Sequence, residues 1–364
     1  MINVFGSSFG KEEISLIKKS FKAGWIGMGP KVREFEDAFE RRIGKPFVMV
    51  NNGSSALHLA VRMLKLKPGS KVIVPSFTFV ACINALLLEG LEPVLCDVEE
   101  DGNMSQESVK KSWTKGVKAI MAVHYGGKAC DMRGLMSLGV PIIEDAAHAV
   151  DTMTDMGYCG AIGRIGAYSF DPIKNLPTPD AGGVAMEANL VEEARCLRDL
   201  GLGSTGFSAA KSGGKWWQNP IVGTFPKYIP NDVAACVALE QLKKLDENQK
   251  KRKNIWDFYR KSLESTELEI PECYRKRNHS FFAFMVILKR RDDLARYLLD
   301  RGVYTTLRFH PLHEYKIFRK YAGKSDYKVS NHLRDHALNL PLHTRLTRKN
   351  LKKVCREIHG FFHA

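Results

Sequence analysis

Residues 167–176 read Ala167-Tyr168-Ser169-Phe170-Asp171-Pro172-Ile173-Lys174-Asn175-Leu176, and Asp180-Ala181-Gly182-Gly183 follow shortly after. The stretch combines an apolar run typical of a buried strand with a lysine and then a turn rich in Pro and Gly. At the end of a core strand a lysine loses part of its hydration, which lowers the pKa of its amine toward the range used in Schiff-base chemistry. Without further context such a lysine is more often a solvated surface charge.

A carboxylate follows a second strand pattern upstream. The run Val140-Pro141-Ile142-Ile143-Glu144-Asp145 is typical of a buried strand that ends in an acidic residue. A strand-end lysine and a strand-end aspartate in one α/β chain indicate pyridoxal phosphate (PLP). Lys174 can form an imine with this cofactor, and Asp145 can keep its pyridine nitrogen protonated. Outside this frame, Asp145 is equally typical of a helix cap after a strand.

A third pattern predicts a phosphate cradle. In Val48-Met49-Val50-Asn51-Asn52-Gly53-Ser54-Ser55-Ala56-Leu57, a strand breaks at Gly53 and a helix follows. Backbone N–H groups and the hydroxyls of Ser54 and Ser55 therefore lie at a helix N-terminus, where phosphate groups bind well. The alternative is an ordinary serine cap. The three patterns together favour the cofactor site.

Strand and helix patterns alternate between residue 46 and about residue 188, which predicts a mostly parallel sheet covered by helices. Seven strands are expected, at 47–50, 71–74, 92–96, 118–124, 140–144, 165–170 and 183–186. Ligands of such sheets bind at the carboxyl ends of the strands. Gly53, Asp145 and Lys174 all lie at such ends.

The remaining chain predicts a large domain over 1–240 and a smaller α+β domain over 241–364. The large domain begins with helices at 11–22 and 31–44 and includes a mobile loop at about 201–226. Beyond the loop, a helix is expected from Asn231 toward Phe258, a strand-like segment at 279–290, and helices at 291–301 and 347–362.

Composition narrows the class of protein. The 364 residues carry a net charge of +15, which raises nucleic acid as a partner, but the basic residues lie mainly in the last third and are not interleaved with aromatics. A solvated basic face is therefore expected, with attraction of anionic substrates as a secondary effect. Eight scattered cysteines without a CxxC pair favour reduced thiols and no metal site. With no apolar run long enough for a membrane span and no signal-peptide profile, a cytoplasmic protein is expected.

The chain resembles the DegT/DnrJ/EryC1/StrS group of PLP-dependent sugar aminotransferases, of fold type I. The matches run nearly from end to end, at 24–36, 75–80, 144–149, 169–176, 308–313 and 340–343. The resemblance implies transfer of an amino group, from glutamate through the PLP and pyridoxamine (PMP) forms, to a keto sugar that is nucleotide-linked. Products of this kind serve surface polysaccharides or glycoconjugates. The resemblance also implies a homodimer with a shared active site.

The resemblance assigns roles residue by residue. Lys174 holds the cofactor and moves a proton, and Asp145 pairs with the ring nitrogen. His148 lies beside the 3′-oxygen, Phe79 stacks on the ring face, and Ser169 joins Ser54 and Ser55 at the phosphate. The segment around Arg308, His310 and His313 approaches the sugar or its diphosphate.

One segment departs from the family pattern. Family members carry an asparagine that reaches the phosphate of the neighbouring subunit, and here Ile229 occupies the matching position in Phe225-Pro226-Lys227-Tyr228-Ile229-Pro230-Asn231-Asp232. Either Lys227 or Asn231 takes over that contact, or the contact is missing.

Two alternatives remain at the level of the sequence. Related sugar dehydratases replace the lysine by histidine, so the presence of Lys174 favours transamination. A regulatory or nucleic-acid-binding protein on the same scaffold is the other alternative. A protein that only binds has no need of the lysine, the aspartate and the phosphate cradle together.

Overall fold

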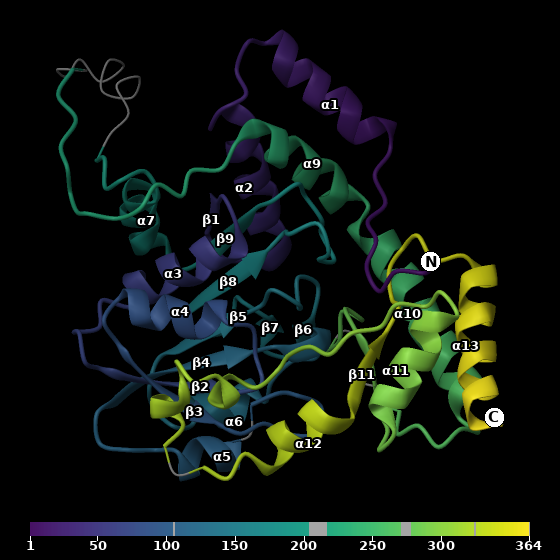
Figure 1. Cartoon of the computed structure of the whole chain (residues 1–364). Coiled ribbons are helices and arrows are strands. Elements are labelled where there is room, and N and C mark those ends of the chain that lie inside the picture. The colour runs from purple at the N-terminus through teal and green to yellow at the C-terminus, as the bar shows by residue number, and fades with distance from the viewer. Residues whose placement is uncertain (105, 204–216, 271–277, 324, 364) are drawn as a thin grey trace.

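The computed structural model describes residues 1–104, 106–203, 217–270, 278–323 and 325–363 (Figure 1). Its centre is a seven-stranded sheet in the order β1-β9-β8-β5-β4-β2-β3. Only β9 runs antiparallel to its neighbours; the pairs from β8 to β3 are all parallel. The predicted sheet is confirmed, with strands β1 (Phe47–Val50), β2 (Lys71–Pro75), β3 (Glu92–Cys96), β4 (Val117–Val123), β5 (Ile142–Asp145), β8 (Ile165–Ser169) and β9 (Gly182–Ala185).

Helices cover both faces of this sheet because the strands are apolar on both sides. In β1, Val48 and Val50 pack into one cluster with α3 and α4, whereas Phe47 and Met49 pack into another with α2 and α9. The helices of this part are α1 (Lys11–Lys22), α2 (Pro30–Ile43), α3 (Gly53–Met63), α4 (Ala81–Leu88), α5 (Gln106–Lys111), α6 (Met132–Met136), α7 (Val191–Arg198) and α9 (Asp232–Lys243). A small hairpin, β6 (Met153–Thr154) and β7 (Gly157–Tyr158), follows β5.

A second apolar core lies in the C-terminal part. An antiparallel pair, β10 and β11, packs with α10, α11 and α13 around Trp256, Tyr259 and Phe284 (Figure 1). Ile2 joins this core through a bridge to Val303. The elements are α10 (Leu245–Leu263), β10 (Phe284–Ile287), α11 (Arg291–Asp300), α12 (Lys328–His336), β11 (Ala337–Leu340) and α13 (Arg348–Phe362).

The structure differs from the expected elements in several places, and strand β11 and the β6–β7 hairpin are among the elements that were not expected. The helix expected from Asn231 to Phe258 is two helices, α9 and α10, which meet at Lys244. The strand expected at 279–290 is confined to β10, because Phe281 has a φ of 51° that interrupts the extended run. Helix α12 was not expected, since its sequence has few apolar positions to reveal a helical period.

Two expectations stay predictions. The domain boundary expected after residue 240 falls inside the last turn of α9, which ends at Lys243. The mobile loop expected at about 201–226 falls largely on 204–216, which lie outside the described residues.

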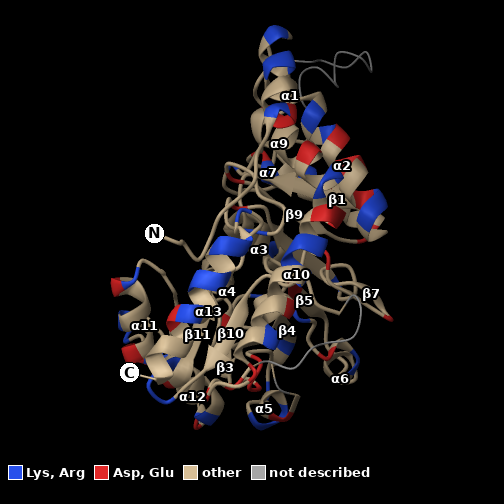
Figure 2. Cartoon of the chain, turned by 90° about the vertical axis from the view of Figure 1, so that its right-hand side faces the viewer, with Lys and Arg blue, Asp and Glu red and all other residues tan. Residues whose placement is uncertain are grey.

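Basic residues lie on α1, α2, α11 and α13, and acidic residues lie on α2 and α11, so charges of both signs occur in both parts of the chain (Figure 2). None of the described helices is long and apolar enough to cross a membrane.

Candidate active site

Eight predicted site residues line one cavity of about 350 Å³ at the carboxyl edge of the sheet. They come from segments far apart in the sequence and comprise Gly53, Ser54, Phe79, Asp145, His148, Ser169, Lys174 and Arg308. Since β2, β5 and β8 are parallel, the loops that follow them meet at this edge. This is where ligands of doubly wound sheets bind.

Lys174 stands on a turn and not directly on the strand. Strand β8 ends at Ser169, and the backbone N–H of Lys174 donates to the carbonyl of Asp171 at 2.9 Å. Burial, followed by the positive charge of Arg308, lowers the pKa of Lys174 to about 8 against the opposing effects of Asp145 and Asp171. An appreciable fraction of this amine is therefore unprotonated near neutral pH, as nucleophilic and proton-transfer chemistry require.

Asp145 is the last residue of β5 and is 5% exposed. Its Oδ1 accepts the backbone N–H of Ala147 at 2.9 Å, and its Oδ2 accepts the thiol of Cys82 at 3.1 Å. Within the described part of the chain, no Lys or Arg forms an ion pair with this carboxylate. A buried carboxylate with spare acceptor capacity is suited to a cationic N–H donor such as a protonated pyridine ring.

His148 faces the same cavity from the turn after β5. Its ring stacks on Phe282 at 4.0 Å between ring centroids, and burial with the nearby charges of Lys174 and Arg308 holds its pKa well below the usual range. Its Nδ1 is buried and has no hydrogen-bond partner among the described residues. A buried, unpaired ring nitrogen beside the cavity is a ready partner for an oxygen atom of a bound ligand.

The turn at Gly53 leaves room for a phosphate group. A Cβ atom at this position would lie 2.6 Å from the Cβ and 2.8 Å from the Oγ of Ser169, so any larger residue would fill the cradle. Helix α3 begins here, capped by Asn52, whose Oδ1 accepts the N–H of Ser55. Together with the exposed hydroxyl of Ser54, this helix start fits the phosphate of PLP.

Arg308 is a buried cation that forms no ion pair with a described carboxylate, although the charge of Asp171 acts on it. It is 6% exposed, and its guanidinium lies 4.1 Å from the ring centroid of Phe5 and 4.7 Å from that of Phe282. Its side chain forms no hydrogen bond or ion pair with any described residue. The aromatic rings cover the guanidinium faces, and its N–H edge remains for an anionic group from the cavity.

Five predicted site residues lie outside this cavity, and two of them are fixed by other contacts. Ser55 is buried in the first turn of α3. His313 bonds to Ser76 Oγ at 2.7 Å and to Asn331 Oδ1 at 3.1 Å, and its ring stacks on Tyr327. Both ring nitrogens of His313 are thus engaged in holding the C-terminal segment to the end of β2.

The other three are more open. Lys227 and His310 are exposed, and the ring of His310 packs edge-on against Tyr315. Asn231 is the N-cap of α9, where its Oδ1 accepts the N–H of Ala234 at 2.9 Å. In this chain none of the three reaches the cavity.

Sequence reasoning missed several residues of the cavity wall. Thr78 and Asp171 line it and stand inside the motifs already quoted, so their position next to Phe79 and Lys174 was an available signal. Phe5 and Phe282, which hold Arg308, come from the N-terminal segment and from the turn before β10. No local pattern connects these two residues to the site.

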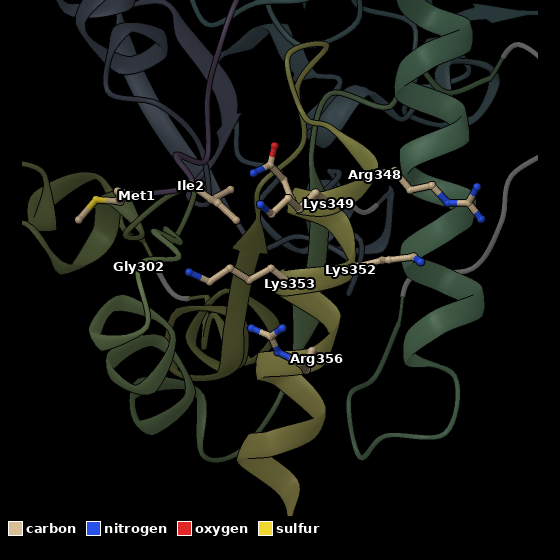
Figure 3. Close-up of a pocket in the computed structure, with 9 residues that line it drawn as sticks. Met1, Ile2, Gly302, Arg348, Lys349, Lys352, Lys353 and Arg356 are labelled. Atoms are coloured by element: carbon tan, nitrogen blue, oxygen red, sulfur yellow. The ribbon is translucent and has the colours of Figure 1, made fainter.

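A separate cavity of about 700 Å³ lies along α13 and contains none of the predicted site residues (Figure 3). Its charged lining residues are all basic: Arg348, Lys349, Lys352, Lys353 and Arg356. No aromatic residue lines this cavity. The expectation of a solvated basic face is consistent with these side chains and stays a prediction.

The fold and the cavity define a PLP-dependent transferase of fold type I. Residues 7–359 match the model of the DegT/DnrJ/EryC1/StrS aminotransferase family, and the chain belongs to this family. Since this is a family of aminotransferases, the chain is an enzyme of this class, and members of the family use PLP.

Named relatives act on sugars. The dTDP-4-dehydro-2,3,6-trideoxy-D-glucose 4-aminotransferase of Saccharopolyspora spinosa is 33% identical over 98% of this chain and 96% of the relative. The GDP-perosamine synthase of Vibrio cholerae is 29% identical, with 100% and 99% of the two chains covered. The crystal structure of the aminotransferase TlmJ from Streptoalloteichus hindustanus superposes with a TM-score of 0.92 at 32% identity, covering 100% of this chain and 99% of that one. The predicted sugar aminotransferase is thereby confirmed.

Proposed function

We propose that this enzyme transfers an amino group from glutamate to the carbonyl carbon of a nucleotide-linked keto sugar, and that the cavity at Lys174 is where the transfer takes place. The observation that carries the proposal is the convergence of Lys174, Asp145 and the Gly53 cradle in one cavity. The relatives named above support the nucleotide-linked sugar, since one is a dTDP-sugar enzyme and another makes GDP-perosamine.

When bound, PLP supplies an electron-withdrawing ring that stabilises negative charge on the carbon bearing the amino group. Asp145 would hold the ring nitrogen in its protonated form, and Phe79 would lie against the ring face. Gly53, Ser54 and Ser169 would hold the phosphate, with His148 beside the ring oxygen. Lys174 would carry the proton between the carbon that bears the amino group and the C4′ carbon of the cofactor, because its amine lies in the cavity and has a lowered pKa.

Arg308 supports an anionic substrate at this site. A cation with 6% exposure and no partner in the described chain is costly unless a ligand compensates it. Both substrates carry such a group, the carboxylates of glutamate and the diphosphate of the sugar nucleotide. His310 and Lys227, which are exposed outside the cavity, remain candidates for the more distant parts of the sugar nucleotide.

A dehydratase-like reaction on the same fold is the second candidate. The sequence feature that separates the two reactions is the lysine, which the dehydratases lack. Lys174 is present and lies in the cavity, and this favours aminotransfer. A binding protein without catalysis would not need a lysine of lowered pKa beside an unpaired aspartate.

We also propose a homodimer that shares its active sites. Helix α1 and the turn after it expose a row of large apolar side chains, with Ile14 at 68%, Phe21 at 57% and Trp25 at 58% exposure. Exposed apolar surface of this kind is typical of an interface. In such a dimer Asn231 or Lys227 would approach the phosphate of the neighbouring subunit. A cytoplasmic location, favoured by the scattered cysteines, remains part of the proposal.

The test is an assay of the purified enzyme with PLP, glutamate and a panel of nucleotide-linked 3-keto and 4-keto sugars. We expect 2-oxoglutarate and an amino sugar to form in equal amounts with one class of sugar, and neither to form with Lys174→Ala. Release of water from the sugar without consumption of glutamate would favour the dehydratase. Sedimentation of an active monomer at assay concentration would contradict the shared site.

A further inference from the structure

The carboxylate of Asp145 is held by a thiol from another element. Cys82 lies in the first turn of α4 and is 0% exposed. Its Sγ donates to Asp145 Oδ2 at 3.1 Å and lies 3.3 Å from the Oγ1 of Thr78. Because Ala147 occupies Oδ1, the two donors approach different oxygens of the carboxylate and fix its plane. The loop and helix that contribute Phe79 to the cavity therefore also set the orientation of Asp145.

The chemical nature of this donor is unusual for the position. A thiol is a weak hydrogen-bond donor, and a buried carboxylate more often receives hydroxyl or N–H groups. Burial and the negative charge of Asp145 raise the pKa of Cys82 well above its usual range, so the thiol stays protonated and donates to the carboxylate. A weak donor orients the carboxylate while leaving most of its negative charge available.

We propose that Cys82 is a positioning residue for the reaction: its thiol holds Asp145 in the orientation that receives the protonated ring nitrogen of PLP. The inference rests on the proposed role of Asp145. It adds Cys82 to the site, although this residue does not line the cavity and would not contact a bound substrate.

The test compares three substitutions at Cys82 in the full chain. Cys82→Ser keeps a donor, Cys82→Val removes it at similar volume, and Cys82→Ala removes it and leaves a void. The measurements are the dissociation constant of PLP for the cofactor-free protein, and kcat and KM of the holoenzyme. We expect Cys82→Val and Cys82→Ala to weaken PLP binding about threefold to tenfold, as for loss of one hydrogen bond, and to lower kcat with KM unchanged. Cys82→Ser should bind PLP within about twofold of the parent.

A matched control separates positioning from packing. Cys96 is also 0% exposed and stands at the end of β3, where its thiol makes no hydrogen bond to Asp145. Cys96→Ala should therefore leave PLP affinity and kcat unchanged. If Cys96→Ala and Cys82→Ala weaken PLP binding equally, the effect belongs to packing and the proposal fails.

A double-mutant cycle with Asp145→Asn gives the decisive result. If Cys82 acts through Asp145, Cys82→Ala should have no further effect on PLP affinity in the Asp145→Asn background. Additive losses would overturn the inference. The outcome is distinct from failure of the proposed function: in that case Asp145→Asn alone would leave PLP binding and turnover intact. If Cys82→Ala binds PLP normally while Asp145→Asn binds it much more weakly, the positioning role of Cys82 is wrong and the role of Asp145 stands.

Discussion

Replacing Arg308 with methionine should stabilise the ligand-free protein while impairing substrate binding. Burial lowers the pKa of Arg308 to about 10, against the smaller opposing effects of Tyr125 and Asp171. At about 1.36 kcal/mol for each tenfold change in acidity, keeping this charge in the folded state costs about 3 kcal/mol. Because the folded-state pKa is lowered, the cost is present in full at neutral pH and begins to decrease only as the pH rises above about 10.

Contacts with the two aromatic rings offset part of this cost. Each cation–π contact contributes about 0.5–2 kcal/mol, so the two contacts leave a net cost of at most about 2 kcal/mol for the guanidinium. Methionine fills similar space without a charge and can pack between Phe5 and Phe282. We therefore expect Arg308→Met to raise the free energy of unfolding of the cofactor-free protein by up to about 2 kcal/mol. Urea denaturation at neutral pH measures this value.

Function should change in the opposite direction. A hydrogen bond to a charged group contributes about 1.5–3 kcal/mol, so KM for one anionic substrate should rise about tenfold or more in Arg308→Met. Comparison of glutamate with the sugar nucleotide identifies which substrate Arg308 binds. The control is Arg198→Met, since Arg198 is buried but forms an ion pair with Glu36 and donates to the carbonyl of Met49. That variant should lose about 3 kcal/mol of stability. If Arg308→Met is also destabilised, Arg308 has a structural partner and the reasoning is wrong.

Three further predictions follow from the same geometry. Gly53→Ala should weaken PLP binding about tenfold or more, because the added Cβ meets Ser169 at 2.6 Å. The control Gly27→Ala should leave PLP binding unchanged, because its Cβ meets nothing closer than 3.6 Å. Equal PLP affinities of the two variants would show that the phosphate binds elsewhere. The rate of PLP incorporation into the cofactor-free protein should rise with pH as Lys174 loses its proton, with a midpoint near pH 8 and a plateau above it; a midpoint near the ordinary value for lysine would contradict the lowered pKa. Lys227→Ala should weaken PLP binding if this lysine replaces the phosphate contact that is absent at Ile229. Asn231→Ala should mainly lower the stability of the fold by about 1 kcal/mol, because it removes the N-cap of α9. If Asn231→Ala alone loses PLP, the phosphate contact belongs to Asn231.

Sequence patterns predicted the sheet and most of the cavity because both depend on local signals. A buried strand has a short apolar run, and the functional residues of parallel strands stand where these runs end. Asp145 and the turn at Gly53 were found in this way, and Lys174 was found although β8 ends five residues before it. The parallel direction of the central strands follows from the same alternation, since connections through helices make neighbouring strands parallel, whereas the order of the strands does not follow from it.

Residues that depend on contacts between distant segments could not be predicted in this way. His313 has the same motif context as Arg308, yet it bonds to Ser76 and Asn331, whereas Arg308 lies in the cavity. The difference arises from Phe5 and Phe282, which belong to segments without a recognisable motif. The hydrogen bond from Cys82 to Asp145 likewise joins α4 to β5 across the carboxyl edge, and nothing in either segment alone indicates it.

The two positive charges of Lys174 and Arg308 lie close together at the cavity and affect each other. Lys174 and Arg308 lie within 5.0 Å and 4.7 Å of the same Phe282 ring, so two cations share one region of low water content. Burial lowers the pKa of the Lys174 amine and repulsion by Arg308 adds to this shift, while Arg308 itself forms no ion pair with a described residue. An anionic substrate relieves the second effect, and its negative charge raises the pKa of the amine again. Substrate binding at Arg308 would thus make Lys174 a stronger base when the proton has to move.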